Sequence, residues 1–403
     1  MTAHPVTEHP VTEHPVTAMP GRRAATIPGS GIRAVAAAAW ARPGTVHLEF
    51  GEPAYDTEPH IIDAADRAAR AGHTHYGPTA GLPEFRAAVA TKLVRDNGWT
   101  EQAADPAHVV VTGGGTGALF AAYSAILDDG DEILVPDPGW PNFSAIAYSV
   151  SARPVGYPVD PATGGPPPPE TLDRLKTGKT RAILVNSPSN PTGAVWTADQ
   201  LAAVGEWATG NGLWVISDEC YDRLGFDGPP AGMATSSPDT RTVSIFSLSK
   251  SYAMTGWRLG YAVAPPDLAA AMTRVQEAMA SCVSTVGQFA GIAALLGPQD
   301  SVDTMRAAYR ATRDAAVATC DQLGLDYVQP SGAFYLWLRL PDRIGDAQRL
   351  AFDLVERRGI AVAPGPAFGP AGAGHLRVSL AATSADVTAG LAAISAELEE
   401  GAR

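Results

Sequence analysis

The sequence predicts an α/β protein in which a large domain with a doubly wound, mostly parallel sheet is joined to a smaller α+β domain. Short β-rich runs alternate with alanine-rich helical stretches through the first three quarters of the chain, an order typical of βαβ units. The runs are continuously apolar rather than alternating, as in strands that are covered on both faces. After about residue 297 a long helical stretch precedes further strand-like runs, which indicates the second domain.

The predicted strands of the large sheet are apolar runs that are each followed by polar or glycine-rich sequence. They cover residues 109–112, 132–135, 182–185, 214–217 and 244–247. Ligands of doubly wound sheets bind beyond the carboxyl ends of the strands, so we expect functional residues directly after these runs. In the second domain we predict a helix over residues 301–323 and strands over residues 333–338 and 375–380.

We place the large domain at residues 53–296 and build the small domain from residues 27–52 together with residues 297–403. Residues 1–26 are expected to be a disordered tail. Val-Thr-Glu-His-Pro repeats put a proline at every fifth position there, and proline interrupts both helices and strand pairing. The tail also contains histidines, but a metal site in it is disfavoured, since a flexible segment must first be ordered to form one.

Composition excludes several classes of partner. The chain has 403 residues with 42 acidic and 29 basic side chains, a formal net charge of −13. Nucleic acids and anionic membranes attract surfaces with a cationic footprint, so neither is an expected partner. Any site for an anion must therefore be local.

The cysteines Cys220, Cys282 and Cys320 are far apart and form no C-x-x-C pair. We therefore expect neither a zinc site nor a disulfide framework, and a reducing cytoplasm fits best. No apolar run reaches the ~20 residues that a membrane-spanning helix needs. The N-terminus also lacks the basic and apolar regions of a secretory signal.

Lysine is rare in this chain, so each one can be weighed separately. Lys92 lies on a predicted amphipathic helix, and Lys176 and Lys179 flank a glycine turn, so all three are predicted to be surface residues. Lys250 instead follows the apolar run 244–249 at the end of a strand. A lysine that is desolvated there can act as an amine nucleophile toward a carbonyl group. From position alone, it can equally be a lysine whose amine extends to water.

The residues around Lys250 decide between these two interpretations. Residues 247–261 resemble the lysine motif of the class I and II aminotransferases, which are fold-type I enzymes dependent on pyridoxal phosphate (PLP). Further similar motifs follow the family's order at residues 186–193, 217–221 and 375–379. The resemblance extends from about residue 27 to the C-terminus. It implies the fold-type I PLP-dependent transferase fold and pyridoxal 5'-phosphate as cofactor.

The resemblance also implies roles for the residues that would hold and tune the cofactor. Lys250 would form the internal aldimine and later move a proton between the substrate Cα and the cofactor. Asp218 would pair with the pyridine nitrogen, and Tyr221 and Asn190 would donate hydrogen bonds to the phenolic oxygen. Without the resemblance, Asp218 can be a helix N-cap and Asn190 part of an Asn-Pro turn.

A glycine-rich segment supplies a candidate phosphate site. Residues 113–120 follow a strand and open a helix, where backbone N–H groups and the helix dipole attract an anion. By resemblance, the phosphate is held by Gly114, Gly115, Thr116, Ser247 and Arg258. The alternative for Arg258 is a surface salt bridge.

The remaining matches concern the substrate and a second subunit. Trp140 resembles the aromatic residue that stacks over the cofactor ring, although a tryptophan there can also fill the core. Arg377 would grip the substrate carboxylate with two parallel hydrogen bonds, close to Gly51, and Asn190 and Trp140 would also border the substrate. Tyr76 resembles a tyrosine that reaches the phosphate bound by the other subunit, which implies a homodimer.

Three other motifs overlap these residues. Residues 113–118 fit the G-x-G-x-x-A pattern of dinucleotide-binding oxidoreductases, with Asp137 at about the expected ~20 residues beyond, but that hypothesis leaves Lys250 unexplained. Residues 247–250 fit the S-x-x-K of penicillin-interacting serine enzymes, yet the accompanying motif is in the wrong order and no S-D-N occurs. A phosphate loop at residues 178–180 lacks its first glycine, which is replaced by Asp173.

We therefore expect a PLP-dependent aminotransferase that moves an amino group between an L-α-amino acid and a 2-oxo acid by a ping-pong mechanism. The nearest alternative is a PLP-dependent lyase, cyclase or oxidase on the same fold. The substrate side chain stays open, because no second cation can be assigned to a side-chain carboxylate. A lining formed by Ile32, Trp140 and the loops near Phe334 admits apolar, aromatic or basic side chains.

Overall fold

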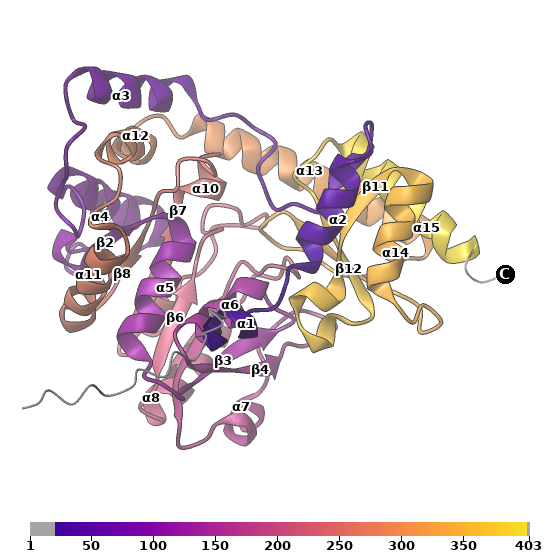
Figure 1. Cartoon of the computed structure of the whole chain (residues 1–403), viewed down its shortest axis with the longest axis horizontal. Coiled ribbons are helices and arrows are strands. Elements are labelled where there is room, and N and C mark those ends of the chain that lie inside the picture. The colour runs from indigo at the N-terminus through magenta and orange to yellow at the C-terminus, as the bar shows by residue number, and fades with distance from the viewer. Residues whose placement is uncertain (1–20, 401–403) are drawn as a thin grey trace, which may run out of the picture.

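The structure is a computed structural model that describes residues 21–400. Its strands form a larger and a smaller sheet, each with its own helices (Figure 1). This arrangement confirms the predicted α/β class with a mostly parallel large sheet and a second α+β part. No helix within residues 21–400 is both long enough and apolar enough to cross a membrane.

The large sheet has the strand order β2-β8-β7-β6-β5-β3-β4. Its strands are β2 (Val109–Thr112), β3 (Glu132–Asp137), β4 (Arg153–Pro158), β5 (Thr180–Asn186), β6 (Trp214–Asp218), β7 (Thr242–Ser247) and β8 (Gly260–Val263). Strands β4, β3, β5, β6 and β7 run parallel, whereas β8 is antiparallel to both β2 and β7. All the strand runs predicted for this sheet are confirmed.

Strands β4 and β8 were not predicted, and each has a local reason. Edge strand β4 begins and ends near proline and has an exposed, interrupted burial pattern, which is where sheets tolerate proline. Strand β8 begins inside the segment that resembles the lysine motif, so Gly260 and Tyr261 were assigned to that motif, and only two residues of the strand lie beyond it.

Helices cover both faces of this sheet, as the continuous apolar runs predict. One face packs against α5 (Gly114–Ile126), α6 (Pro141–Ser149) and α11 (Pro266–Ala280). The other face packs against two groups of helices. The group at one end of the sheet consists of α3 (Pro59–Arg70), α4 (Pro83–Asn97) and α12 (Thr285–Leu296). The group at the other end consists of α7 (Pro169–Leu175) and α8 (Ala198–Gly210). The strands therefore bury side chains on both sides.

The second sheet has the order β1-β11-β12-β10-β9. Its strands are β1 (Val46–Leu48), β9 (Asp326–Val328), β10 (Tyr335–Arg339), β11 (Ile360–Pro364) and β12 (His375–Ser379). It packs with α2 (Gly31–Trp40), α13 (Asp300–Leu323), α14 (Ala347–Asp353) and α15 (Ser384–Glu400). Parallel pairing of β1 with β11 brings the N-terminal segment beside the C-terminal one, and Figure 1 shows α2 among these late elements. The helix predicted over residues 301–323 is confirmed.

Two expectations differ from the structure. The repeats of the predicted tail lie outside the described residues, but its last part contains the short helix α1 (Arg22–Thr26), in a stretch of good helix-forming residues. Lys92, predicted to be a surface residue, is only 2% exposed and pairs with Asp222. Periodicity shows which residues of a helix share a face, but it does not show that a charged residue on the buried face has a distant partner.

Candidate functional site

The strand register of the large sheet brings polar residues together at the carboxyl ends of its parallel strands. Asn186 at the end of β5 pairs with Asp218 at the end of β6, and Ser247 at the end of β7 pairs with Gly260 of β8. A Cβ atom at Gly260 would lie 2.6 Å from the backbone carbon of Gly114. Glycine at this position therefore lets the first turn of α5 approach the strand ends.

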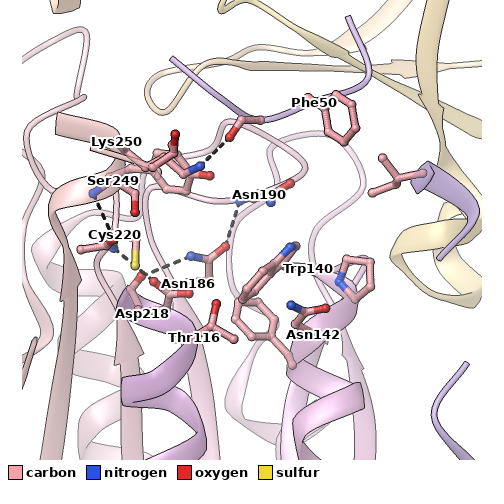
Figure 2. A pocket seen from close by; sticks show the side chains of 18 of the residues that line it. Phe50, Thr116, Trp140, Asn142, Asn186, Asn190, Asp218, Cys220, Ser249 and Lys250 are labelled. Carbon is pink, nitrogen blue, oxygen red and sulfur yellow. Dashed lines mark hydrogen bonds between the residues drawn. The ribbon is translucent and has the colours of Figure 1, made fainter. Parts of the chain in front are cut away.

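A cavity of about 310 Å³ lies at this edge, between the large sheet and the second sheet. Figure 2 shows Lys250, Asp218 and Trp140 around it. The cavity brings together all but two of the site residues predicted from the sequence. These are Gly51, Gly115, Thr116, Trp140, Asn190, Asp218, Tyr221, Ser247, Lys250, Arg258 and Arg377.

Lys250 lies on α10 (Leu248–Ser251), the short helix that directly follows β7. Ser247 caps this helix, since its hydroxyl oxygen accepts a hydrogen bond of 3.2 Å from the backbone N–H of Ser249. The Lys250 amine donates to the backbone oxygen of Gly51, across the cavity (Figure 2). Burial lowers the pKa of this amine to about 8. About a tenth of it is then neutral at pH 7, as a nucleophile or base requires.

Asp218 presents a carboxylate at the floor of the same cavity. It is buried, its Oδ1 accepts a 3.1 Å hydrogen bond from the backbone N–H of Cys220, and burial raises its pKa. Asp218 forms no ion pair with any residue from 21 to 400. A buried carboxylate without a cation is unfavourable, so Asp218 is suited to a cationic N–H group that enters the cavity.

Tyr221 and Asn190 lie on the wall toward the second sheet. The Tyr221 hydroxyl is 2.7 Å from the hydroxyl of Tyr335, and the side-chain oxygen of Asn190 accepts a 2.9 Å hydrogen bond from Arg377. A Cβ atom at position 51 would lie 1.9 Å from the Tyr335 hydroxyl oxygen. Because of this close approach, only glycine fits at position 51.

Arg377 projects from β12 and is only 2% exposed. Its guanidinium donates to Asn190 and to the backbone oxygen of Glu49, and it lies over the rings of Tyr335 and Phe368 at 4.4 and 4.9 Å from their centroids. Its buried Nε has no hydrogen-bond partner among residues 21–400. Burial lowers its pKa. A fixed guanidinium with a spare donor can bind a carboxylate that enters the cavity.

Arg258 and the first turn of α5 form a second cationic region. Gly114 has φ +80°, and a Cβ atom there would lie 2.7 Å from Arg258 Nη2. The guanidinium donates to the backbone oxygens of Thr255 (2.9 Å) and Gly113 (3.3 Å), and it makes no ion pair within residues 21–400. Its charge, the helix N-terminus and the hydroxyl of Thr116 together suit a phosphate.

Two of the predicted site residues lie outside this lining. Gly114 directly precedes Gly115, and its lack of a Cβ atom leaves room for Arg258, as described above. Tyr76 is 89% exposed. Its hydroxyl is predicted to reach the site of another subunit, and a single chain with this side chain exposed does not test that prediction.

The cavity also contains residues to which the sequence analysis gave no role. They include Arg33, Glu49, Phe50, Asn142, Asn186, Cys220, Ser249 and Tyr335. Asn186 and Cys220 belong to the quoted motifs and could have been found there. Tyr335 was assigned only to a strand, and Arg33 only to the segment before the large domain. Nothing in their local sequence indicates that they meet at one cavity.

Comparisons with known proteins agree with this geometry. The model of the family "Aminotransferase class I and II" matches residues 43–394. A probable aspartate/prephenate aminotransferase of Thermus aquaticus is 38% identical over 83% of this chain and 87% of its own length. The aromatic-amino-acid aminotransferase 2 of Thermococcus litoralis is 34% identical over 84% of this chain and 87% of its own length.

Solved structures give the same result. The aspartate aminotransferase of Thermus thermophilus with maleate superimposes with a TM-score of 0.88 at 35% identity. The superposition covers 94% of this chain and 100% of that structure. The similarity therefore includes both sheets and the cavity between them.

Proposed function

Because this chain belongs to the class I and II aminotransferase family, we propose that Lys250 is the residue that binds the family's cofactor and moves the proton in the reaction. The protein is a PLP-dependent aminotransferase that transfers an amino group between an amino acid and a 2-oxo acid. The observation that carries the assignment is the meeting of Lys250 and Asp218 in one cavity. One is a partly buried amine with a lowered pKa, and the other is a buried carboxylate that forms no ion pair within residues 21–400.

The residues of the cavity fit pyridoxal phosphate at both of its polar ends. Asp218 would accept a hydrogen bond from the ring N–H and keep that nitrogen protonated. Arg258, Thr116 and the first turn of α5 would hold the phosphate. Trp140 would cover the ring. When bound, the cofactor supplies an electron sink for the pair of electrons left at Cα after its proton is removed.

The substrate would be oriented by residues of the second sheet. Arg377 would bind the α-carboxylate through two N–H groups, close to the backbone of Gly51. This contact fixes which Cα bond faces the Lys250 amine. In its neutral form Lys250 Nζ would accept the Cα proton, and in its protonated form it would donate that proton again to complete the transfer. Tyr221 would donate its hydroxyl hydrogen and Asn190 its side-chain N–H to the cofactor's phenolic oxygen. The Tyr221 oxygen can still accept from Tyr335, and the Asn190 oxygen from Arg377.

We also propose a cytoplasmic homodimer in which Tyr76 acts in the site of the other subunit. Large apolar side chains are exposed on this chain at Tyr55, Ile62 and Tyr76, as is common at subunit interfaces. A second open cavity of about 440 Å³ shares Thr255 with the first one. A side chain that enters this second cavity from a partner would reach the region of Arg258.

The function is tested by one half of the reaction. Purified holoenzyme mixed with an amino acid, without any 2-oxo acid acceptor, should release about one 2-oxo acid per site and then stop, because a ping-pong transaminase keeps the amino group. The measurement is the 2-oxo acid released, together with the visible absorption of the bound cofactor. Continued release far beyond the enzyme concentration would instead establish the lyase or oxidase alternative.

The role of Lys250 is tested by Lys250→Ala beside the matched control Lys179→Ala, which removes an exposed lysine. Loss of a positioned base costs about 10²–10⁴-fold in rate, so Lys250→Ala should lose at least about 10²-fold in kcat with an unchanged circular dichroism spectrum. The control should keep the wild-type rate. Turnover by Lys250→Ala at the wild-type rate would remove Lys250 from the mechanism.

A further inference from the structure

The cavity is lined by more cations than the proposed mechanism uses. Its basic residues are Arg33, Lys250, Arg258 and Arg377. Lys250 carries the amine chemistry, Arg258 lies at the phosphate region and Arg377 at the α-carboxylate. Arg33 has no task in that scheme, and it is the cation that sequence analysis did not assign to the site.

Arg33 belongs to the first turn of α2. The Ser30 hydroxyl oxygen caps this helix by accepting a 3.3 Å hydrogen bond from the backbone N–H of Arg33, and Ser30, Ile32 and Arg33 all line the cavity. The helix itself is fixed to the second sheet, because Val35 and Ala39 are buried in that sheet's core. The backbone that carries Arg33 is therefore held on the same sheet as Arg377.

The Arg33 guanidinium has no partner within the described part of the chain. It is exposed and makes no hydrogen bond or ion pair with any residue from 21 to 400. The acidic residues of the lining are Glu49 and Asp218, and both are buried. Glu49 Oε1 is hydrogen-bonded to His47 Nδ1 at 2.8 Å, and Asp218 lies at the cofactor region. An unpaired cation at the mouth of a substrate cavity can be neutralised only by solvent or by a ligand.

A second polar side chain in the cavity lining also lacks a hydrogen-bond partner among the described residues. Asn142, on α6 beside Trp140, lines the cavity, and its side-chain amide makes no hydrogen bond with the described residues. Figure 2 shows its amide close to the Trp140 side chain. A guanidinium and an amide N–H group are both donors that suit a carboxylate, and the guanidinium can bind it with two parallel hydrogen bonds.

We propose that Arg33 is a specificity-determining residue that binds a second carboxylate, carried by the side chain of the substrate. The inference rests on the proposed function, because it takes the transamination site as given. Arg377 holds the α-carboxylate and Arg33 the distal one, so an acidic amino acid and its 2-oxo acid are bound at both ends by the second sheet. Asn142 contributes a further donor from the large sheet's side.

The test compares acidic and neutral donors in holoenzyme of the wild type, Arg33→Gln and Arg42→Gln. Arg42 is an exposed arginine just after the same helix and lies outside the cavity, so it is the matched control. A hydrogen-bonded charge pair contributes about a 10- to 100-fold difference. Arg33→Gln should lower kcat/KM for L-aspartate and L-glutamate by that factor and leave L-alanine and L-phenylalanine within about twofold. Arg42→Gln should change neither class.

A second measurement uses inhibitors and does not depend on turnover. Succinate, which has two carboxylates, should inhibit Arg33→Gln about 10- to 100-fold more weakly than it inhibits the wild type, whereas butyrate should inhibit both equally. An equal loss for acidic and neutral donors, or no loss for acidic ones, would overturn the role of Arg33. A wild type that transaminates neutral donors but no acidic donor would overturn it too, while leaving the proposed function intact. Failure with every amino acid would overturn the proposed function itself.

Discussion

Glu219 shows how a single residue beside the site makes stability depend on pH. It follows Asp218 in the chain, is only 3% exposed, and its Oε1 has no hydrogen-bond partner among residues 21–400. Burial raises the pKa of this carboxyl to about 7, although the hydroxyls of Ser217 and Ser244 act to lower it; the charge of Asp222 adds to the rise and that of Lys92 opposes it. Glu219 is therefore protonated in the folded protein over a pH range in which an unfolded chain would have ionised it.

The sign of the pH effect follows from that shift. Between the carboxyl's ordinary pKa of 4.5 and about 7 the folded state binds the proton more tightly, so its stability falls as pH rises through this window and then levels off. Glu219→Gln should remove this part of the slope. Between pH 4.5 and 8 the variant should lose up to about 3 kcal/mol less of its unfolding free energy than the wild type does.

Urea unfolding of holoenzyme at several pH values measures the difference. Glu206→Gln, which changes an exposed glutamate on α8, is the control and should follow the wild type. Parallel pH profiles for Glu219→Gln and the wild type would contradict the assigned ionisation. The test is independent of activity, because Glu219 does not line the cavity.

At the level of residues, the sequence predicted the groups that lie in short motifs. Asp218 ends a strand, and Asn190 and Lys250 lie a few residues after one, so their place at one end of the sheet follows from the topology. Tyr335 and Arg33 were not predicted as site residues, because their position depends on how the second sheet packs against the first. That packing joins parts of the chain hundreds of residues apart, and no local pattern indicates it.

Among the elements, α4 is tied to the site strand by a buried ion pair. Lys92 on α4 donates to Asp222, and its amine also donates to the side-chain oxygen of Asn97 at 2.7 Å. Asn97 in turn donates to Asp222 at 3.1 Å, and the Lys92 amine lies 4.8 Å from the centre of the Phe246 ring. Asp222 closely follows Asp218 and Tyr221, so this pair fixes α4 against the strand end that carries them.

Removing one partner of this pair should be costly. Lys92→Met leaves Asp222 buried without its cation, and breaking a buried pair in this way destabilises a protein by about 3–5 kcal/mol. The double variant Lys92→Met/Asp222→Leu removes both charges and should recover most of that loss. Urea unfolding measures both variants, with Lys176→Met as a control for the loss of a lysine outside this pair. A single variant as stable as the wild type would show that the pair contributes nothing.

The elements themselves were largely predictable where periodicity or continuous burial is strong. Helix α13 and the parallel strands of the large sheet agree with prediction because their apolar patterns are long or flanked by turns. The missed strand β4 contains Pro154 and Pro158, and the missed strand β8 has only four residues and begins with Gly260. Segments of that kind form strands only through their neighbours in the sheet, which the local sequence does not specify.

For the whole molecule, the two sheets divide the work between cofactor and substrate. Strand ends of the large sheet supply Asp218, Ser247 and the segment that carries Lys250, whereas the second sheet supplies Arg377 and, through α2, Arg33. We propose that these two parts are the predicted domains, residues 53–296 and residues 27–52 with 297–403. A substrate held by both arginines would then join one domain to the cofactor held by the other.

The proposed homodimer is tested by mixing two defective subunits. One subunit carries Lys250→Ala and the other Tyr76→Ala, and hybrids are purified through two different affinity tags. If Tyr76 acts across the interface, the subunit that keeps Lys250 receives an intact Tyr76 from its partner, so the hybrid contains one complete site. It should then show about half the wild-type kcat and wild-type affinity for pyridoxal phosphate.

The Tyr76→Ala homodimer is the reference for this comparison, because both of its sites lack the hydroxyl. Loss of a hydrogen bond to a charged phosphate should weaken its cofactor affinity about 10- to 100-fold. If Tyr76 served its own subunit, the hybrid's Lys250-containing site would keep this defect and the hybrid would resemble the reference. If no doubly tagged species formed, the chain would not be a dimer. If cofactor affinity recovers in the hybrid but not in the Tyr76→Ala homodimer, the chain is a dimer and Tyr76 acts in the site of the partner subunit. A structural role of Tyr76 within its own subunit cannot produce this result, because it could not restore a site from the other chain.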